Sequence, residues 1–285
     1  MRLLRRLSYA LRMGLRFYLF QLLLRYYWVQ WILPFEAVNL VFAFLSMYFI
    51  GVAAGAGNSV YAEYGGFVNF LLTGLVANTI LKSSLGSAVH ATEFLVRGRI
   101  GGATGQALST YDYCLILGIP VAAPLMASIA DDFSEAAAFA AIYLLVGTIF
   151  HYTFPADPLT AVAAVALGSL SLFGISLIAA AFMIRFNTWR GGVNPIIWAI
   201  TTLSNVFAGI YFPVEVIPAG LRWVSWLLPQ TYTLSLLRAA AAGAPPGEML
   251  WDAAVLAAAA AVLLPLGAYW YRRELEGLRR RPPII

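Results

Sequence analysis

The side chains that could do chemistry are few, and most of them have no partner at a useful spacing. The only lysine, Lys82, follows Leu81, whereas the phosphate-binding loop of an ATPase needs Gly-Lys-Ser/Thr. His90 and His151 are far apart, and neither His-Glu-x-x-His nor Gly-x-Ser-x-Gly occurs. Cys114 is the one cysteine, so no intrachain disulfide can form. The sequence therefore predicts a chain that is not an enzyme and binds no metal or cofactor of its own.

Polar side chains within apolar stretches form a second group of chemically useful residues. Such side chains usually face the interior of a helix bundle, where they bond to other helices or line a path for a polar group. The residues that we assign to a transport path are Asn69, Asn78, Thr201, Ser204 and Asn205. Hydrogen bonding between helices is the alternative for each of them. Further along the chain, segment 131–135 reads Asp-Asp-Phe-Ser-Glu and concentrates acidic charge.

The elements that position these residues are expected to be membrane helices. Of the 285 residues, 61% are hydrophobic and 11% are charged, and the mean hydropathy is +0.80. A soluble domain has about 25% charged residues, so too few polar side chains are present to cover a water-facing surface. We expect an all-α fold with a single membrane domain over residues 1–285. The net charge of +5 is attributed to basic cytoplasmic loops, and no nucleic acid is expected as a partner.

Six spans fit this length, at about 20 residues per span plus a loop. The expected spans run over residues 34–54, 67–90, 135–152, 159–184, 195–211 and 249–271. Two interpretations stay open before the third span. In the preferred one, residues 113–130 form an interfacial or re-entrant helix broken by Pro120 and Pro124, and Asp132 or Ser134 caps the span. In the other, one long kinked helix carries the acidic residues in a protein-lined cavity.

Residues 1–25 are predicted to form an amphipathic helix at the membrane surface. On a helical wheel the leucines gather on one side and five arginines fall within an arc of about 120° on the other. These arginines are Arg2, Arg5, Arg6, Arg12 and Arg16. The apolar side would lie in the acyl boundary, with the arginines directed toward anionic lipid head groups. The basic region is too long for a signal peptide.

Basic residues are distributed unevenly between the two sides of this six-span layout. One side would hold the N-terminal arginines, the arginines that follow the second and fourth spans, and the basic tail 272–285. The other side would hold only Arg222 and Arg238, beside several acidic residues. The positive-inside rule then places both termini in the cytoplasm and the chain in the inner (cytoplasmic) membrane.

The segment from Asn194 to Arg238 starts as an apolar helix and then breaks at several prolines. Proline lacks an N–H and clashes with the preceding turn, so this segment cannot form one straight helix. It resembles a signature of the membrane subunits of type-2 ATP-binding-cassette (ABC) exporters. The matching residues are Ala208-Gly209, Phe212-Pro213, Pro218, Leu228-Pro229 and Arg238. The resemblance implies that residues 212–238 form small re-entrant helices at the outer side of the pathway, whereas the alternative is an amphipathic loop.

The resemblance also covers segment 91–112, between the second and third expected spans. In this family the equivalent segment forms a coupling helix that docks on a separate ATPase. The similar positions are Glu93, Arg97, Gly98, Arg99, Gly101, Gly102 and Thr104, with a wider spacing between Glu and Arg than is usual. The alternative is an ordinary basic loop.

The complex that the resemblance implies has two membrane subunits, identical or different, and two ATPase subunits that bind ATP and Mg. Membrane lipid would surround this chain, and its cargo would be an amphiphile such as a drug-like molecule, a lipid or a lipid-linked glycan. A second hypothesis is an ion-coupled transporter or channel without an ATPase, for which segment 131–135 could serve. A third is an integral-membrane enzyme or assembly factor, which the lack of a polar catalytic cluster disfavours.

Overall fold

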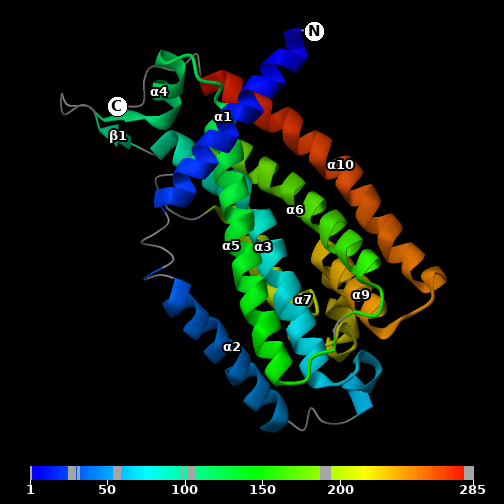
Figure 1. The fold of residues 1–285 in the computed structure, drawn as a ribbon. Helices are drawn as coiled ribbons and strands as arrows, with labels where there is room; N and C mark the ends of the chain where they lie inside the picture. The colour runs from blue at the N-terminus through cyan, green and yellow to red at the C-terminus, as the bar shows by residue number, and fades with distance from the viewer. Residues whose placement is uncertain are drawn as a thin grey trace.

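Helices form nearly all of the structure, a computed structural model that describes residues 2–24, 30, 33–53, 59–97, 99–101, 107–153, 155–186 and 194–278 (Figure 1). Within these residues, five helices are long and apolar enough to cross a membrane. They are α2 (Leu33–Ala53), α3 (Phe67–Arg97), α5 (Ala122–Ile149), α6 (Pro158–Phe186) and α10 (Pro246–Leu278). The prediction of a helical chain with several membrane-length helices is thereby confirmed.

The predicted fifth span is too short to cross a membrane alone. α7 (Pro195–Phe207) has 13 residues, which gives about 20 Å against a hydrocarbon core of about 30 Å. It begins at Asn194, whose Oδ1 accepts hydrogen bonds from the backbone amides of Ile196 (3.1 Å) and Ile197 (3.3 Å). It ends just before Gly209, whose φ of +79° does not continue an α-helix. In place of the six predicted spans, the described chain has five long helices and this shorter one.

The chain breaks at Pro120, between the helix α4 (Thr110–Ile116) and α5, as the preferred interpretation expected, but α5 then runs without interruption from Ala122 to Ile149, which corrects the expected break at Pro124 and the separate span from residue 135. Pro124 lies in the first turn of α5, where amides have no acceptor within the helix and a missing N–H removes no bond. Pro120 precedes the helix. Segment 131–135 is therefore inside a membrane-length helix, and Ser134 donates to the Asp131 carbonyl oxygen (2.8 Å) rather than capping a new span.

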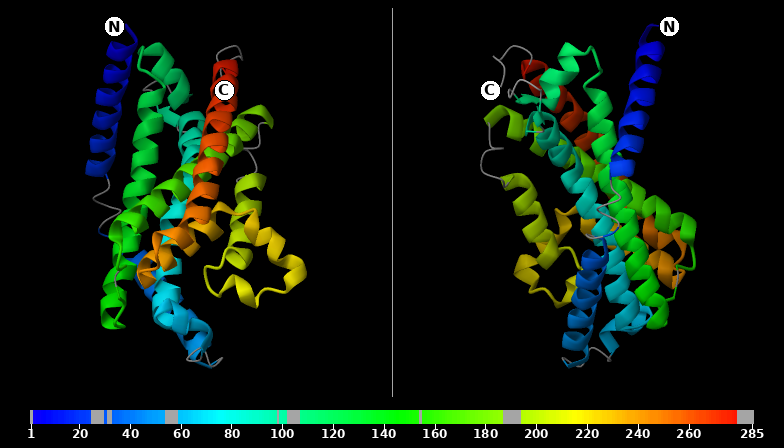
Figure 2. Two further views of the ribbon diagram at one scale, coloured as in Figure 1. Left: turned by 90° about the vertical axis from the view of Figure 1, so that its right-hand side faces the viewer. Right: turned by 60° about the vertical axis from the view of Figure 1, so that its left-hand side comes forward.

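α3 lies at the centre of the bundle between α5 and α6, and α6 packs along α10 (Figures 1 and 2). Small residues allow α6 and α10 to approach closely. A Cβ atom at Gly174 would overlap the backbone of Leu263, and one at Gly267 would overlap the carbonyl group of Gly174. At the same interface, Ser171 Oγ donates to the Leu256 carbonyl oxygen (3.2 Å).

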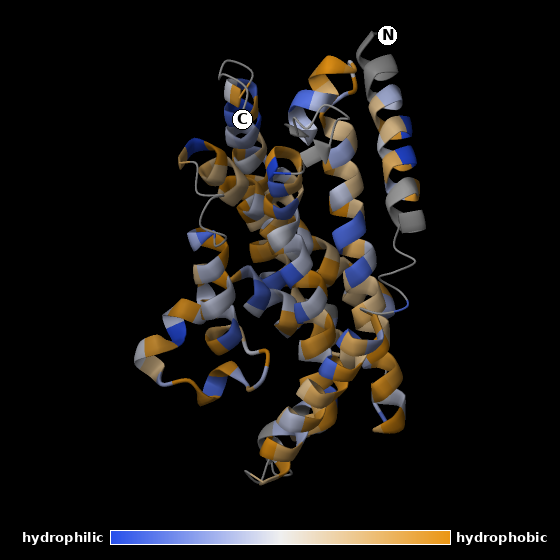
Figure 3. Cartoon of the chain, turned by 90° about the vertical axis from the view of Figure 1, so that its left-hand side faces the viewer, coloured by the Kyte–Doolittle hydropathy of each residue, from blue (hydrophilic) through white to orange (hydrophobic). Residues whose placement is uncertain are grey.

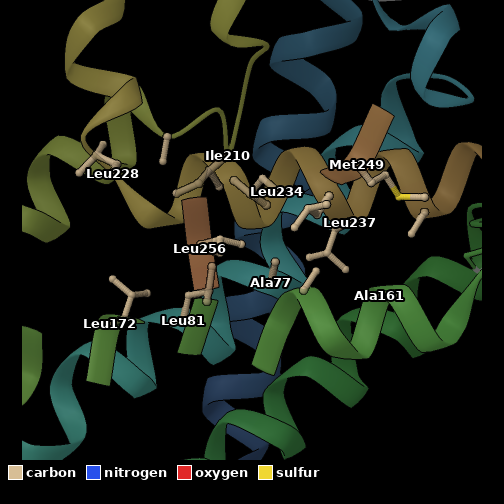
Figure 4. Close-up of a cluster of buried hydrophobic side chains, with 14 of the residues drawn as sticks. Ala77, Leu81, Ala161, Leu172, Ile210, Leu228, Leu234, Leu237, Met249 and Leu256 are labelled. Atoms are coloured by element: carbon tan, nitrogen blue, oxygen red, sulfur yellow. The ribbon is translucent and has the colours of Figure 1, made fainter. Parts of the chain in front are cut away.

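The largest core cluster joins α3, α6 and α10 to α9 (Pro229–Ala242) (Figure 4). Leu81, Leu172, Leu234 and Leu256 are each at most 1% exposed. In α2, by contrast, only Phe44 and Gly51 are buried in the described chain. It packs on the end of α5 through Phe44 but presents most of its apolar surface outward.

The start of α1 and the end of α10 lie at the same end of the bundle (Figure 1). The other elements at this end are the antiparallel strands β1 (Arg99–Gly101) and β2 (Ala107–Ser109) and the helix α4 (Thr110–Ile116). α1 (Arg2–Leu24) crosses the beginning of α5, where Gly14 lies against Ala123. The 3-10 helix η2 (Ser59–Tyr64) lies at the opposite end, before α3.

Candidate functional site

Charged side chains from two helices line an open pocket between α2, α3 and α5. Its volume is about 710 Å³. Lys82 and His90 reach the pocket from α3, and Asp132 and Glu135 reach it from α5. Hydrophilic residues interrupt the otherwise apolar helices partway along the bundle (Figure 3). Charges at this depth are costly and usually mark a functional site, and the acidic residues here face a protein-lined cavity as the second interpretation of their segment stated.

The contacts between α3 and α5 fix the positions of these charges. His90 Nδ1 lies 3.5 Å from Asp132 Oδ2. Ser83 Oγ donates to the Asp132 carbonyl oxygen at 2.9 Å, which holds the two helices together at this level. Glu135 follows one turn later on α5. Lys82 forms no ion pair or hydrogen bond with any residue that the structure describes. The pocket therefore contains charges of both signs.

A second candidate site surrounds Arg238, on α9. The Arg238 side chain is 8% exposed, and its guanidinium carbon lies 3.5 Å from the centroid of the Phe70 ring. Its Nη2 donates to the carbonyl oxygens of Phe70 (3.3 Å) and Ile210 (3.5 Å). A Cβ atom at Gly74 would overlap the Ile210 carbonyl and lie 3.2 Å from Arg238 Nη2. Arg238 thus fastens the chain that follows α7 to the start of α3.

The segment between α7 and α9 is a series of short helices, as its prolines predicted. These are η4 (Val214–Val216), η5 (Ala219–Leu221) and α8 (Arg222–Trp226). Pro213 precedes η4, Pro218 precedes η5, and Pro229 is the first residue of α9, where its missing N–H is tolerated. Arg222 links two of these pieces by donating to the carbonyl oxygens of Ile217 (2.8 Å) and Glu215 (2.5 Å).

Only some of the predicted gate residues come together around Arg238. A Cβ atom at Gly209 would lie 3.6 Å from Arg238 Nη1 and 3.7 Å from the Phe212 carbonyl oxygen. Pro213 and Arg238 line a pocket of about 640 Å³, which also includes Trp226 and Trp251. Pro218 and Pro229 do not line this pocket. Phe70, which contacts the Arg238 guanidinium, had no signal in the sequence because it comes from a distant apolar helix.

The predicted coupling segment 91–112 is more structured than a loop. Glu93 and Arg97 belong to the last turns of α3, where Arg97 Nη1 pairs with Glu93 Oε1. Arg99 and Gly101 belong to β1, whereas Gly98, Gly102 and Thr104 lie outside the described residues. Sequence reasoning missed α4. Its signal was the Ser-x-x-Asp pattern of a capped helix, since Ser109 Oγ accepts a hydrogen bond from the backbone amide of Asp112 (3.1 Å).

α4 connects this segment to the long helices. Tyr111, 5% exposed, belongs to a buried cluster with Val96 of α3, Ile184 of α6 and Leu278 of α10. A displacement of α4 would therefore also move side chains of α3, α6 and α10, because buried side chains in contact cannot move independently.

The residues assigned to a transport path do not gather in one place. Asn69 ties the start of α3 to the residues after α5, since its Nδ2 donates to Thr153 Oγ1 (2.8 Å) and its Oδ1 accepts from the Thr153 amide (3.0 Å). Asn78 lines the charged pocket. Thr201, Ser204 and Asn205 lie on α7 and do not line it. The Ser204 hydroxyl and Asn205 Oδ1 are buried without a hydrogen-bond partner in the described part of the chain.

The helix predicted over residues 1–25 is present as α1, and its location at a membrane surface stays a prediction. Arg12 and Arg16 are exposed, and on the other side Leu11 (48%) and Leu15 (58%) are also exposed. The backbone of Arg2, Arg5 and Arg6 belongs to α1, but their side chains lie outside the described ones. Of the basic tail, residues 272–278 continue α10, with an exposed pair between Arg272 Nε and Glu276 Oε1 (3.0 Å), and residues 279–285 lie outside the description.

Comparison with known proteins gives this chain no family. No protein-family model matches it, and no curated protein is significantly similar to it. Among the described residues there is also no group of three or more side chains that could hold a metal ion. Its function must therefore be inferred from its own residues and geometry.

Proposed function

We propose that the chain is the membrane subunit of a type-2 ABC exporter, which exports an amphiphile using ATP hydrolysed on a separate subunit. The observation that carries this proposal is the half-length helix α7 followed by the short helices that Arg238 fastens to α3. In that family, small re-entrant helices before the last span cap the pathway. α7 together with this segment stands where a fifth pass would be, so α10 returns to the end of the bundle where α1 starts.

The order of the remaining elements supports the same proposal. An amphipathic helix, α1, comes first, and a structured segment with a helix, α4, follows the second membrane-length helix. Both lie at the end of the bundle that we propose to be cytoplasmic. There α4 would receive the motion of the ATPase and pass it to α3, α6 and α10 through the Tyr111 cluster. ATP and Mg would bind to that ATPase and not to this chain.

A pull-down from native membranes tests this function. The tagged chain is purified in mild detergent, and the proteins that co-purify are identified by mass spectrometry. We expect a P-loop ATPase in stoichiometric amount, together with a second membrane subunit that is either another copy of this chain or a related one. A homogeneous preparation without any ATPase would contradict the exporter proposal.

The charged pocket favours a second candidate function, an ion-coupled transporter or channel. Carboxylates, an imidazole and an ammonium group at membrane depth are the groups that bind and release ions or protons. In that case Asp132→Asn would abolish ion-driven transport in proteoliposomes that contain this chain alone. Transport that needs both ATP and the ATPase, and that continues after the ion gradient is collapsed, would exclude this candidate.

A further inference from the structure

The pocket between α2, α3 and α5 presents opposite charges from two different helices. Lys82 extends from α3, whereas Asp132 and Glu135 extend from α5. We propose that this pocket binds the head group of a zwitterionic amphiphile, with its anionic phosphate on Lys82 and its ammonium group on the two carboxylates. This inference goes beyond the exporter proposal, because binding of this kind requires no ATPase.

The α3 side of the pocket is suited to an anion. Lys82 has no ion-pair partner in the described chain, although it lies near the middle of a membrane-length helix. An unpaired ammonium group at that depth is costly, and an anionic partner offsets this cost. Asn78 lies one turn before Lys82 on the same face and also lines the pocket, so its amide can donate to the same phosphate.

The α5 side is suited to a cation. Asp132 and Glu135 are three residues apart, which places both carboxylates on one face of α5. On this side His90 Nδ1 lies 3.5 Å from Asp132 Oδ2. An ammonium group brings three N–H donors, and carboxylates are acceptors for them. With His90 protonated, the four pocket charges cancel, so a ligand that carries both charges fits better than an anion alone.

The α2 side of the pocket is mostly apolar and would contact the hydrocarbon part of the ligand. Leu40, Ala43 and Met47 of α2 line the pocket opposite the charges. α2 is largely exposed on its outward side, so the pocket lies directly behind a helix that is not packed into the core. Acyl chains could extend along these apolar side chains while the head group reaches the charges. Phosphatidylethanolamine has this chemistry, whether it is a resident lipid or the cargo.

The test compares three probes by native mass spectrometry of the purified full-length chain in detergent. Phosphatidylethanolamine carries both charges, phosphatidylglycerol carries only the phosphate, and dodecylammonium carries only the cation, with its three N–H donors. We expect the first to bind at least about tenfold tighter than either of the others, because it alone satisfies both sides of the pocket. Equal binding of phosphatidylglycerol and phosphatidylethanolamine would overturn the proposal.

Pocket variants separate the two charge subsites. Lys82→Met should lower the affinity for phosphatidylethanolamine about tenfold and leave binding of the cationic probe unaffected. Asp132→Asn with Glu135→Gln should also lower the affinity for phosphatidylethanolamine about tenfold but leave binding of phosphatidylglycerol unaffected. Arg272→Gln with Glu276→Gln, in an exposed pair outside the pocket, is the matched control. Ala43→Trp fills the pocket without changing its charge and should also abolish binding. Pocket variants that bind like the control would refute the site.

A further arm distinguishes the two sources of the ligand. After reconstitution with its ATPase, ATP-driven movement of labelled phosphatidylethanolamine between leaflets would identify cargo, and ATP-independent occupancy would identify a resident lipid. Both outcomes support the site. Binding is measured without an ATPase, so failure of the exporter proposal leaves the binding result intact, and absence of binding leaves the co-purification test unaffected.

Discussion

At the scale of single residues, Arg238 shows how a charged side chain is accommodated in an apolar bundle. Its guanidinium lies over the Phe70 ring, and its Nη2 donates to two backbone carbonyl oxygens, which replace part of its hydration, whereas its Nε has no hydrogen-bond partner among the described residues. The planar, delocalised guanidinium suits this environment better than the compact, strongly hydrated ammonium group of lysine. Arg238 therefore acts as the fastening between the segment after α7 and the start of α3.

Substituting Arg238 should loosen this part of the fold. We expect Arg238→Ala to lower the free energy of unfolding by about 2–4 kcal/mol, from the lost ring contact and the charge-assisted hydrogen bonds. Arg238→Lys should recover little of it. Thermal unfolding of the purified chain in detergent measures the effect, with Arg222→Lys as a control at a less buried arginine. A lysine variant as stable as the natural chain would show that charge alone suffices.

At the scale of elements, the close contact between α6 and α10 depends on glycines. Gly174 and Gly267 bring the backbones of α6 and α10 together, and no larger residue fits at either position. The charged end of α3, the strands β1 and β2, and α4 form another unit. The Tyr111 cluster joins this unit to α6 and α10. These two contacts tie α10 to its neighbours, one along α6 and one at the α4 end of the bundle.

A side chain at the α6–α10 contact should separate the two helices. Gly267→Val is expected to destabilise the chain by about 1–3 kcal/mol, because the added atoms overlap the Gly174 carbonyl group. Gly277→Val is the matched control, since a Cβ atom at Gly277 meets nothing within 4 Å. Comparison of their unfolding midpoints gives the answer. Equal midpoints would mean that α6 and α10 do not approach as closely as described.

The end of α3 should matter for coupling and not for insertion. Glu93→Ala, or charge reversal at both Arg97 and Arg99, is expected to leave the chain in the membrane but to uncouple transport from ATP hydrolysis in the exporter that we propose. Glu93 and Arg97 are partly exposed, so their loss leaves the core unchanged. The measurement is the ratio of amphiphile exported to ATP hydrolysed. An unchanged ratio in both variants would remove the coupling role from this segment.

At the scale of the whole molecule, both ends of the described chain reach the same end of the bundle (Figure 1). Five membrane-length helices alone would place them on opposite sides. In the exporter that we propose, α7 and the short helices after it would turn the chain back before α10 and so keep the number of passes even. The basic residues near α1 and the end of α10 would then share one side, and the positive-inside rule predicts that this side is cytoplasmic.

Cysteine labelling tests this topology. Cys114 is the only cysteine, so Cys114→Ser provides a background without thiols. With a membrane-impermeant maleimide on intact cells, Glu248→Cys should be labelled, whereas Ser8→Cys and Arg272→Cys should be labelled only after lysis. Labelling of Ser8→Cys and Arg272→Cys under opposite conditions would mean an odd number of passes.

The sequence by itself determined that this is a helical protein with several membrane-length helices, and it located most of these helices. Long apolar stretches can bury their backbone polar groups in a membrane only as helices, and this holds whatever their neighbours are. The helical spacing of the arginines likewise predicted α1, and the prolines predicted the breaks between α7 and α9. Local rules suffice for these features because each depends on residues near in the chain.

Tertiary structure decided where the chemistry lies. Pro124 falls in a first turn, so α5 is continuous and its carboxylates face Lys82 and His90 across a pocket. Asn69 links the start of α3 to the residues after α5, whereas the Phe70 ring contacts the Arg238 guanidinium. Contacts of this kind join residues far apart in sequence, and they depend on how the helices pack, which periodicity along one helix does not specify.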